Sequence, residues 1–114
     1  MLKEMLDIQR KLQDRLKTLE FKTEQERTLF IKHHAQYVDQ ELHEMLRELP
    51  FFKEWKNYDN WDHKTKLELA KEEFVDVFHF VLNIALALDI SAEDLYCRYL
   101  AKNNVNHERQ NNGY

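Results

Sequence analysis

Glycine, proline and cysteine each occur only once among the 114 residues of the chain. A β-rich domain needs many turns, and turns depend heavily on glycine and proline. Their scarcity therefore indicates long helices joined by few loops. The one cysteine, Cys97, has no partner for an intrachain disulfide, which is typical of a protein from a reducing cytoplasm. We predict an all-α fold in which residues 1–114 form one domain.

Neither the charge nor the apolar runs of the chain suit a nucleic acid or a membrane. The formal net charge is -4, whereas a general nucleic-acid binder usually carries a basic excess. The N-terminus lacks the apolar core of a signal peptide, and the longest apolar stretch, Phe74 to Ile90, is too short and too polar to span a bilayer. We expect a cytoplasmic protein with no nucleic-acid or membrane partner. The negative net charge does not exclude a triphosphate ligand, because metal ions can balance the charge of its phosphates.

Helical segments are predicted from apolar residues at helical spacing and from capping signals. Thr23 followed by Glu26 is a capping-box pattern, and Pro50 ends the helix that it opens. Together the segments predict a compact bundle of four to five helices. The expected ranges are 2–19, 23–49, 63–88 and 91–103.

The third segment carries acidic residues through an otherwise apolar run. From Phe74 to Leu88 it is apolar nearly all round, which predicts burial on most sides, yet Glu73 and Asp76 share one of its faces. Glu41 and Glu44 have the same spacing on the second segment. If the two helices pack antiparallel, four carboxylates converge and repel one another. A hard divalent cation removes this conflict, and Mg²⁺ is the usual choice where substrate phosphates complete its shell.

Other interpretations of these acids stay open from the residues alone. Acidic residues three apart on a helix are usually a solvated face, as Glu41 and Glu44 by themselves would be. Asp76 with His79 loosely suggests a di-iron carboxylate bundle, although that architecture needs the acid–histidine pair twice. A non-catalytic helical interaction module would not need the acids at all.

Several segments of the chain resemble known families. Glu41–Glu44 followed by Glu73–Asp76 resembles the paired ExxE…ExxD signature of the all-α nucleoside triphosphate pyrophosphatases. Nearly the whole chain is similar to the dimeric dUTPase family within that group, and the C-terminal segment is the most specific part. The matching segments are IQRKLQD (8–14), FKEW (52–55), EFVDVFHF (73–80) and YLAKNNVNHERQNNGY (99–114).

The resemblance implies Mg²⁺-dependent hydrolysis of dUTP to dUMP and pyrophosphate. The metal would be held by Glu41, Glu44, Glu73 and Asp76, and it would neutralise phosphate charge and lower the pKa of an attacking water. Glu44 is the carboxylate that we expect to deprotonate this water. His79 is expected beside the substrate or in the core rather than on the metal, because magnesium prefers oxygen.

Gln9 and Gln13 are implied as the residues that read the base. A carboxamide can match the donor and acceptor pattern of a uracil edge. Gln13 stands where the family usually has asparagine. A related pyrophosphatase that acts on dCTP or on a modified nucleotide is therefore the nearest alternative.

Two further segments are expected to meet the sugar and the phosphates. Lysine offers a mobile point charge and arginine a bidentate fork, while asparagine supplies donors and acceptors. A loop after the second helix could also close over the substrate. The residues concerned are Lys53, Trp55, Lys102, Asn103, Asn106 and Arg109.

A homodimer, or a higher homo-oligomer, is expected because the third helix is too apolar for one neighbour to cover. Which residues would cross the interface into the site is left open. The chain also looks short for the family, since only Asp89 and Ile90 link its last two helices. Family members with more material at this point could use it to close over substrate.

Overall fold

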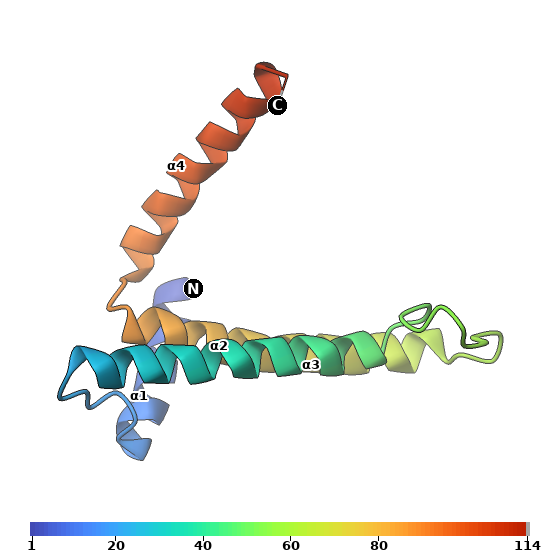
Figure 1. The fold of residues 1–114 in the computed structure, drawn as a ribbon, viewed down its shortest axis with the longest axis horizontal. Helices are drawn as coiled ribbons and strands as arrows, with labels where there is room; N and C mark the ends of the chain where they lie inside the picture. Colours follow the sequence, from blue (N-terminus) through green and yellow to red (C-terminus); the bar gives the residue numbers. More distant parts are fainter. Residues whose placement is uncertain (114) are drawn as a thin grey trace.

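A computed structural model describes residues 1–113, and over these residues it is all-helical, without a strand (Figure 1). The predicted fold class is therefore confirmed. Tyr114, the last residue of the C-terminal segment that carries the resemblance, lies outside the described residues. The helices are α1 (Leu2–Leu16), α2 (Glu24–Arg47), α3 (His63–Ala87) and α4 (Ala92–Asn111).

Side-chain caps start three of the four helices. Thr23 Oγ1 accepts a hydrogen bond from the Glu26 N–H at 3.1 Å, and the Glu26 carboxylate accepts one from the Lys22 N–H at 2.6 Å. This is nearly the predicted capping box, displaced by one residue from its usual backbone donor. Asp62 and Ser91 cap α3 and α4 in the same way as Thr23 caps α2, which satisfies N–H groups that have no partner within the helix.

Two helices end at points that differ from the predicted ones. α1 stops early because Lys17 adopts the left-handed conformation, with φ 56°, and its N–H bonds back to the last turn. α4 continues about two turns past Asn103, to Asn111. It ends just before Gly113, whose φ of 76° is free of steric cost only for glycine.

α2 and α3 form a long antiparallel hairpin, joined by residues 48–62, and share the most extensive helix–helix contact of the chain (Figure 1). α1 crosses the C-terminal part of α3. Where α1 and α3 meet, apolar side chains form a cluster that is shielded from water. Phe78 and Ile90 pack against the edge of this cluster. The cluster consists of Leu6, Leu82, Ala85 and Leu86.

α4 points away from the hairpin (Figure 1). The chain bends by 103° between α3 and α4, and within residues 1–113 the only helix that α4 contacts is α1. The radius of gyration is 18.0 Å, whereas a compact domain of this length has about 13 Å. A single chain thus leaves α4 with little to pack against.

Large apolar side chains remain exposed on α3 and α4. Phe74 is 54% exposed and Val75 is 48% exposed on α3, and Tyr99 is 64% exposed on α4. The expectation that α3 is buried on most sides is therefore not met within one chain. Burial is confined to the face of α3 that meets α1 and α2.

No single helix among residues 1–113 has both the length and the hydropathy that crossing a membrane requires. α3 and α4 meet those criteria only as a pair, and the chain bends sharply between them.

Candidate active site

Four carboxylates from α2 and α3 meet along one side of the hairpin. Glu41 and Glu44 lie about one turn apart on α2, and Glu73 and Asp76 lie about one turn apart on α3. Oxygen atoms of Glu41, Glu73 and Asp76 lie within 4.8 Å of one another. Glu44 is close enough to raise the pKa of both Glu41 and Glu73. The structure therefore brings these four residues, which we call the acid quartet, to one place.

The acid quartet has little positive charge to balance it. Burial, followed by the neighbouring Glu44, raises the pKa of Glu41 to about 7, and Asp76 and Glu73 add to the effect. Burial and the charge of Glu44 also raise the pKa of Glu73. Among residues 1–113, no lysine or arginine forms an ion pair with any of the four. The repulsion among these carboxylates is thus left for protons or a cation to relieve.

The donor set of the acid quartet fits a hard divalent cation. Every donor is a carboxylate oxygen, which is the ligand that magnesium prefers. One carboxylate oxygen of Glu41 is buried without a hydrogen-bond partner, and a buried acceptor left unpaired costs free energy. A bound cation would give this oxygen a partner and would also remove the repulsion among the four carboxylates. Asp76 is exposed in the single chain, so one side of the cluster stays open to phosphate oxygens.

A buried amide network joins α1 to α3 next to the acid quartet. Gln9 and Asn83 are each 3% exposed. The Gln9 amide nitrogen donates to Asn83 Oδ1 at 2.7 Å. His79 Nδ1–H donates to Gln9 Oε1 at 2.8 Å, because an amide oxygen can only accept. His79 lies about one turn beyond Asp76, so the network extends from α1 to the edge of the acid quartet. Sequence reasoning gave no site role to Asn83.

Gln13 is also buried, but its side chain bonds to a residue just after α1 and not to α3. Its side-chain oxygen accepts a hydrogen bond from the Thr18 hydroxyl just after the end of α1. Gln9 is therefore the amide that faces α3, and Gln13 is the amide that stabilises the turn after α1.

Gln9→Leu is expected to destabilise the protein by about 1–3 kcal/mol, because the buried amide of Asn83 would lose its partner and His79 would lose the hydrogen bond that joins it to α1. Denaturant unfolding followed by circular dichroism measures the change. Lys11→Leu, on the exposed side of α1, is the control and should stay within about 0.5 kcal/mol of the wild type. Equal stabilities of Gln9→Leu and Lys11→Leu would contradict a stabilising role of the network.

Residues 48–62 form the loop at the far end of the α2–α3 hairpin (Figure 1). Tyr58 is buried, its ring packs edge-on against Trp61 with centroids 5.0 Å apart, and its hydroxyl accepts a hydrogen bond from the Lys53 N–H at 3.1 Å. Trp55 is 83% exposed. Tyr58 therefore anchors the loop, while the indole of Trp55 is left at its surface.

A cavity of about 200 Å³ at this end of the hairpin is lined by three cationic residues, Arg47, Lys53 and Lys56, and by aromatic rings. Arg47 is the last residue of α2, about one turn after Glu44. The cavity thus lies a short distance along α2 from the acid quartet. Sequence reasoning singled out Lys53 but missed Arg47 and Lys56, which belong to no recognisable motif.

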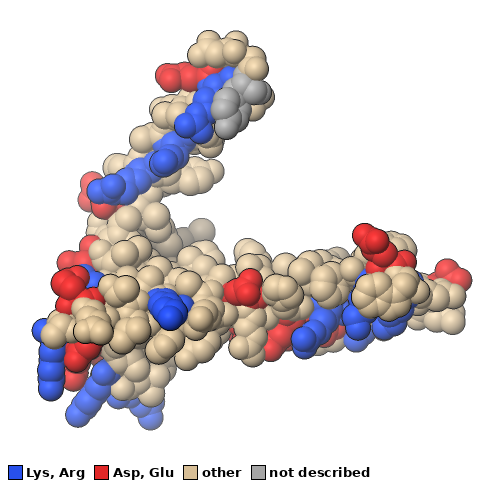
Figure 2. All heavy atoms as spheres, in the orientation of Figure 1, with Lys and Arg blue, Asp and Glu red and all other residues tan. Residues whose placement is uncertain are grey.

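α4 carries the other expected phosphate and sugar contacts. Lys102 and Arg109 line one face of the helix together with Arg98, beside a shallow groove of about 360 Å³. Figure 2 shows the Lys and Arg side chains of α4 in a row along the helix. Asn103 is half-buried and Asn106 is exposed. Because α4 contacts no helix but α1 in the part of the chain described, a single chain does not bring these residues to the acid quartet.

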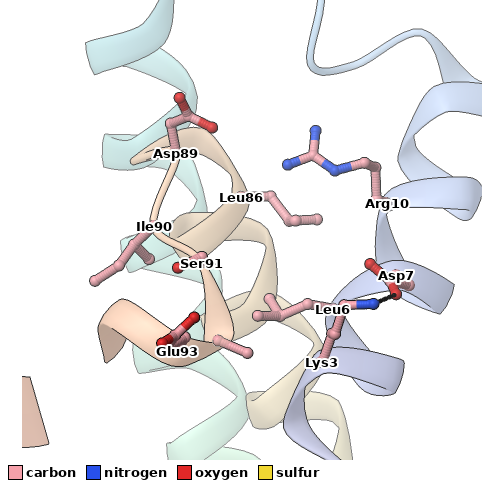
Figure 3. Close-up of a pocket in the computed structure, with 10 residues that line it drawn as sticks. Lys3, Leu6, Asp7, Arg10, Leu86, Asp89, Ile90, Ser91 and Glu93 are labelled. Atoms are coloured by element: carbon pink, nitrogen blue, oxygen red, sulfur yellow. Dashed lines mark ion pairs between the residues drawn. The ribbon is translucent and has the colours of Figure 1, made fainter. Parts of the chain in front are cut away.

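Another cavity, of about 330 Å³, lies between α1 and the turn that joins α3 to α4 (Figure 3). Leu6 and Leu86 form its apolar wall, and Arg10 reaches from α1 toward the turn. Lys3 at its rim pairs with Asp7 at 3.7 Å. None of the expected site residues lines this cavity, so it is not part of the candidate active site. The space between α1 and the start of α4 is therefore only partly filled by side chains.

Comparison with known proteins gives a family and several relatives. The model of a family described as dUTPase matches residues 1–92 and 81–114. A dCTP pyrophosphatase of Enterobacteria phage T4 is 32% identical, across 96% of this chain and 80% of its own length. A dCTP pyrophosphatase of Enterobacteria phage LZ5 is 30% identical across the same shares. A DNA replication protein of Enterobacteria phage T4 is 29% identical across 87% of this chain, but this covers only 32% of its own length. No solved structure matches significantly.

The alignments also show a difference in length. The alignment with the phage T4 dCTP pyrophosphatase spans 138 residues, more than the 114 of this chain, so the relative has residues that this chain lacks. The two stretches that match the family model overlap at residues 81–92, where α3 ends and α4 begins. The length of the alignment does not place these residues, but the overlap puts the break in the family match at the turn between α3 and α4.

Proposed function

The chain belongs to the dUTPase family, and from this membership we propose that it hydrolyses dUTP to dUMP and pyrophosphate with the help of Mg²⁺. That it is a nucleoside triphosphate pyrophosphohydrolase follows from the family and the relatives. The observation that carries the proposal is the acid quartet, whose repulsion and unpaired oxygen call for a hard cation.

The roles within the acid quartet divide by position. When bound, Mg²⁺ would neutralise phosphate charge and make a coordinated water more acidic. Glu41, Glu73 and Asp76 form the tight group that would hold it. Glu44 stands at the margin of that group, so we assign it to orient a water and accept its proton as the water attacks the α-phosphorus. Pyrophosphate is then the leaving group.

Residues at the loop end of the hairpin would bind the triphosphate. Arg47, Lys53 and Lys56 give the neighbouring cavity three positive charges, and charge-assisted hydrogen bonds to phosphate are stronger than neutral ones. Trp55 has an exposed ring that could lie over the bound nucleotide. The phosphates would thus lie between a metal centre and a basic cavity.

Gln9 is the residue that we propose to read the base, with His79 and Asn83 holding its amide in one orientation. A carboxamide has both a donor and an acceptor, so a residue of this type can pair with the edge of uracil or of cytosine. A second candidate function is therefore hydrolysis of dCTP. Its support is that two relatives, at 32% and 30% identity, are dCTP pyrophosphatases.

Pyrophosphate release from each deoxynucleoside triphosphate, with Mg²⁺ and with a chelator, tests the proposal. We expect the highest kcat/KM for dUTP, loss of activity on chelation, and purine triphosphates at least about 100-fold poorer, because a site that bonds a base edge rejects one that leaves it unpaired. A preference for dCTP would replace the first candidate with the second. Absence of pyrophosphate release from every nucleotide would contradict both.

A homodimer is part of the proposal. The exposed faces of α3 and α4 carry large apolar side chains, among them Phe74, Val75, Tyr96 and Tyr99. Apolar surface of this kind on neighbouring elements marks an interaction site, and a two-fold dimer would bury both copies of it at once.

A further inference from the structure

We propose that Asn83 is a positioning residue, which acts through Gln9 to hold the exposed imidazole of His79 in the tautomer that carries its hydrogen on Nδ1. Nε2 of His79 then presents a lone pair beside the acid quartet and accepts a hydrogen bond from an N–H group of the nucleotide base. The tautomer follows from the buried network alone, whereas the contact with a base rests on the proposed function.

A single amide of α1 bridges one turn of α3. His79 and Asn83 lie about one turn apart on α3, on the same face of the helix. Each end of the Gln9 amide meets one of them, with Nε2 at 2.7 Å from Asn83 Oδ1 and Oε1 at 2.8 Å from His79 Nδ1. Both distances are those of good hydrogen bonds. The Gln9 amide therefore cannot turn over without changing both contacts at once.

The hydrogen bonds of this network all run in one direction. Gln9 Oε1 can only accept, so His79 Nδ1 carries a hydrogen, and Gln9 Nε2 can only donate, so Asn83 offers Oδ1. Reversing one member alone would set two donors or two acceptors against each other, which is costly in a buried place. The tautomer of a histidine is set by the hydrogen bonds that its ring nitrogens make. The orientation of Asn83 thus decides the tautomer of His79.

Burial protects the network at Asn83 and leaves it open at His79. Gln9 and Asn83 are each 3% exposed, and Leu6 and Leu86 of the apolar cluster lie about one turn from them along α1 and α3. Water therefore has little access to replace either amide as a partner. His79 is exposed, and its Nδ1 is already bonded to Gln9. Nε2 is the ring nitrogen that remains for a ligand.

A lone pair on His79 Nε2 selects a hydrogen-bond donor on the ligand. Uracil offers such a donor at N3, and cytosine offers one at its exocyclic amino group. His79 lies about one turn beyond Asp76 on α3, so a base that meets His79 is compatible with phosphates at the acid quartet. Reading of the base by Gln9 would thus pass in part through His79, for either candidate substrate.

Nuclear magnetic resonance of the protein with isotope-labelled histidine measures the tautomer without nucleotide or metal. Long-range proton–nitrogen correlation spectra distinguish a neutral ring with its hydrogen on Nδ1 from one with its hydrogen on Nε2, and His79→Gln identifies the signals of His79. At about pH 8.5, where an ordinary histidine is neutral, we expect Nδ1–H as the major form in the wild type. Any spectrum in which Nδ1–H is not the major form of His79 would overturn the inference.

Asn83→Leu tests the role of Asn83, and Asn104→Leu is the matched control at an exposed position of α4. Leucine cannot accept a hydrogen bond, so the Gln9 amide is free to turn and His79 should gain the Nε2–H form. KM for the preferred nucleotide should rise about tenfold with a smaller change in kcat, because the lost contact binds substrate and transition state alike. Asn104→Leu should leave the tautomer, KM and kcat unchanged.

The outcomes separate this inference from the proposed function. An Asn83→Leu protein that keeps its helices by circular dichroism and also keeps the wild-type tautomer would overturn the role of Asn83, and an unchanged KM would overturn the contact with the base. The wild-type spectrum decides the tautomer even if Asn83→Leu does not fold. A wild-type protein with the Nδ1–H form that releases no pyrophosphate from any nucleotide would contradict the proposed function and not the role of Asn83.

Discussion

Glu73→Gln is expected to lower kcat for pyrophosphate release on the order of 10³-fold, which corresponds to about 4 kcal/mol of transition-state stabilisation. The amide is nearly the same size as the carboxylate, so the packing of α2 on α3 survives. It does not carry the negative charge that a hard cation requires. Glu41→Gln and Asp76→Asn should have effects of similar size, because their oxygens belong to the same group.

Steady-state kinetics at saturating nucleotide measures the loss, and two acidic residues outside the acid quartet supply controls. Glu72→Gln and Asp39→Asn make the same change of charge on the same two helices, at exposed positions. Both should stay within about threefold of the wild type, since surface charges are well screened. Losses as large as that of Glu73→Gln in these controls would mean that overall charge, and not the acid quartet, governs activity.

Magnesium is expected to stabilise the folded protein strongly, and more so at higher pH. At a free concentration one hundred times the dissociation constant, a ligand that binds only the folded state adds about 2.7 kcal/mol. For a chain of this size this raises Tm on the order of 10 °C. Thermal denaturation with and without Mg²⁺, between pH 5.5 and 8, measures the effect.

The pH dependence follows from the raised pKa of Glu41. Without a cation, Glu41 has a pKa of about 7 in the folded chain against 4.5 as its ordinary value. Its contribution to stability is therefore fully present below about pH 4.5 and is lost as the pH rises through 7. The pKa of Glu73 is shifted in the same direction. The metal must displace these protons at low pH, so the shift in Tm caused by Mg²⁺ should grow from pH 5.5 to 8.

Glu41→Gln separates this mechanism from general effects of salt. The variant has lost both the repulsion and a ligand, so without metal it should be at least as stable as the wild type at pH 8. The rise in Tm on adding Mg²⁺ should nearly vanish. A Tm shift in the variant equal to that of the wild type would place the cation elsewhere.

Local signals in the sequence account for most of the fold. Thr23, Asp62 and Ser91 start three helices at the predicted places because a cap depends on residues only a few positions away. The sequence also predicted that the acidic residues of α2 and α3 meet. Both amphipathic helices carry two acids at the same spacing, and antiparallel packing brings the two pairs together. The expected end of α4 at residue 103 was too early, because the helix continues to Asn111, just before Gly113 adopts a positive φ.

The features that could not be predicted are those that depend on distant contacts. The pairing of Gln9 with Asn83 and His79 needs the crossing of α1 over α3, which no periodicity encodes. The basic cavity at the loop joins Arg47 to Lys53 and Lys56 only because Tyr58 folds the loop back. The burial of α3 was overestimated for one chain because hydropathy does not distinguish a partner helix of the same chain from that of another copy.

The α2–α3 hairpin also bears on how the protein folds. All four carboxylates lie on two helices that are consecutive in the chain, joined by the one loop of residues 48–62, which Tyr58 anchors. Contacts between neighbouring segments cost less loop-closure entropy than contacts between the termini, and they form faster. The metal ligands should therefore assemble as an early folding unit, before α1 docks, and a cation bound at that stage would act as a template for the helix pair.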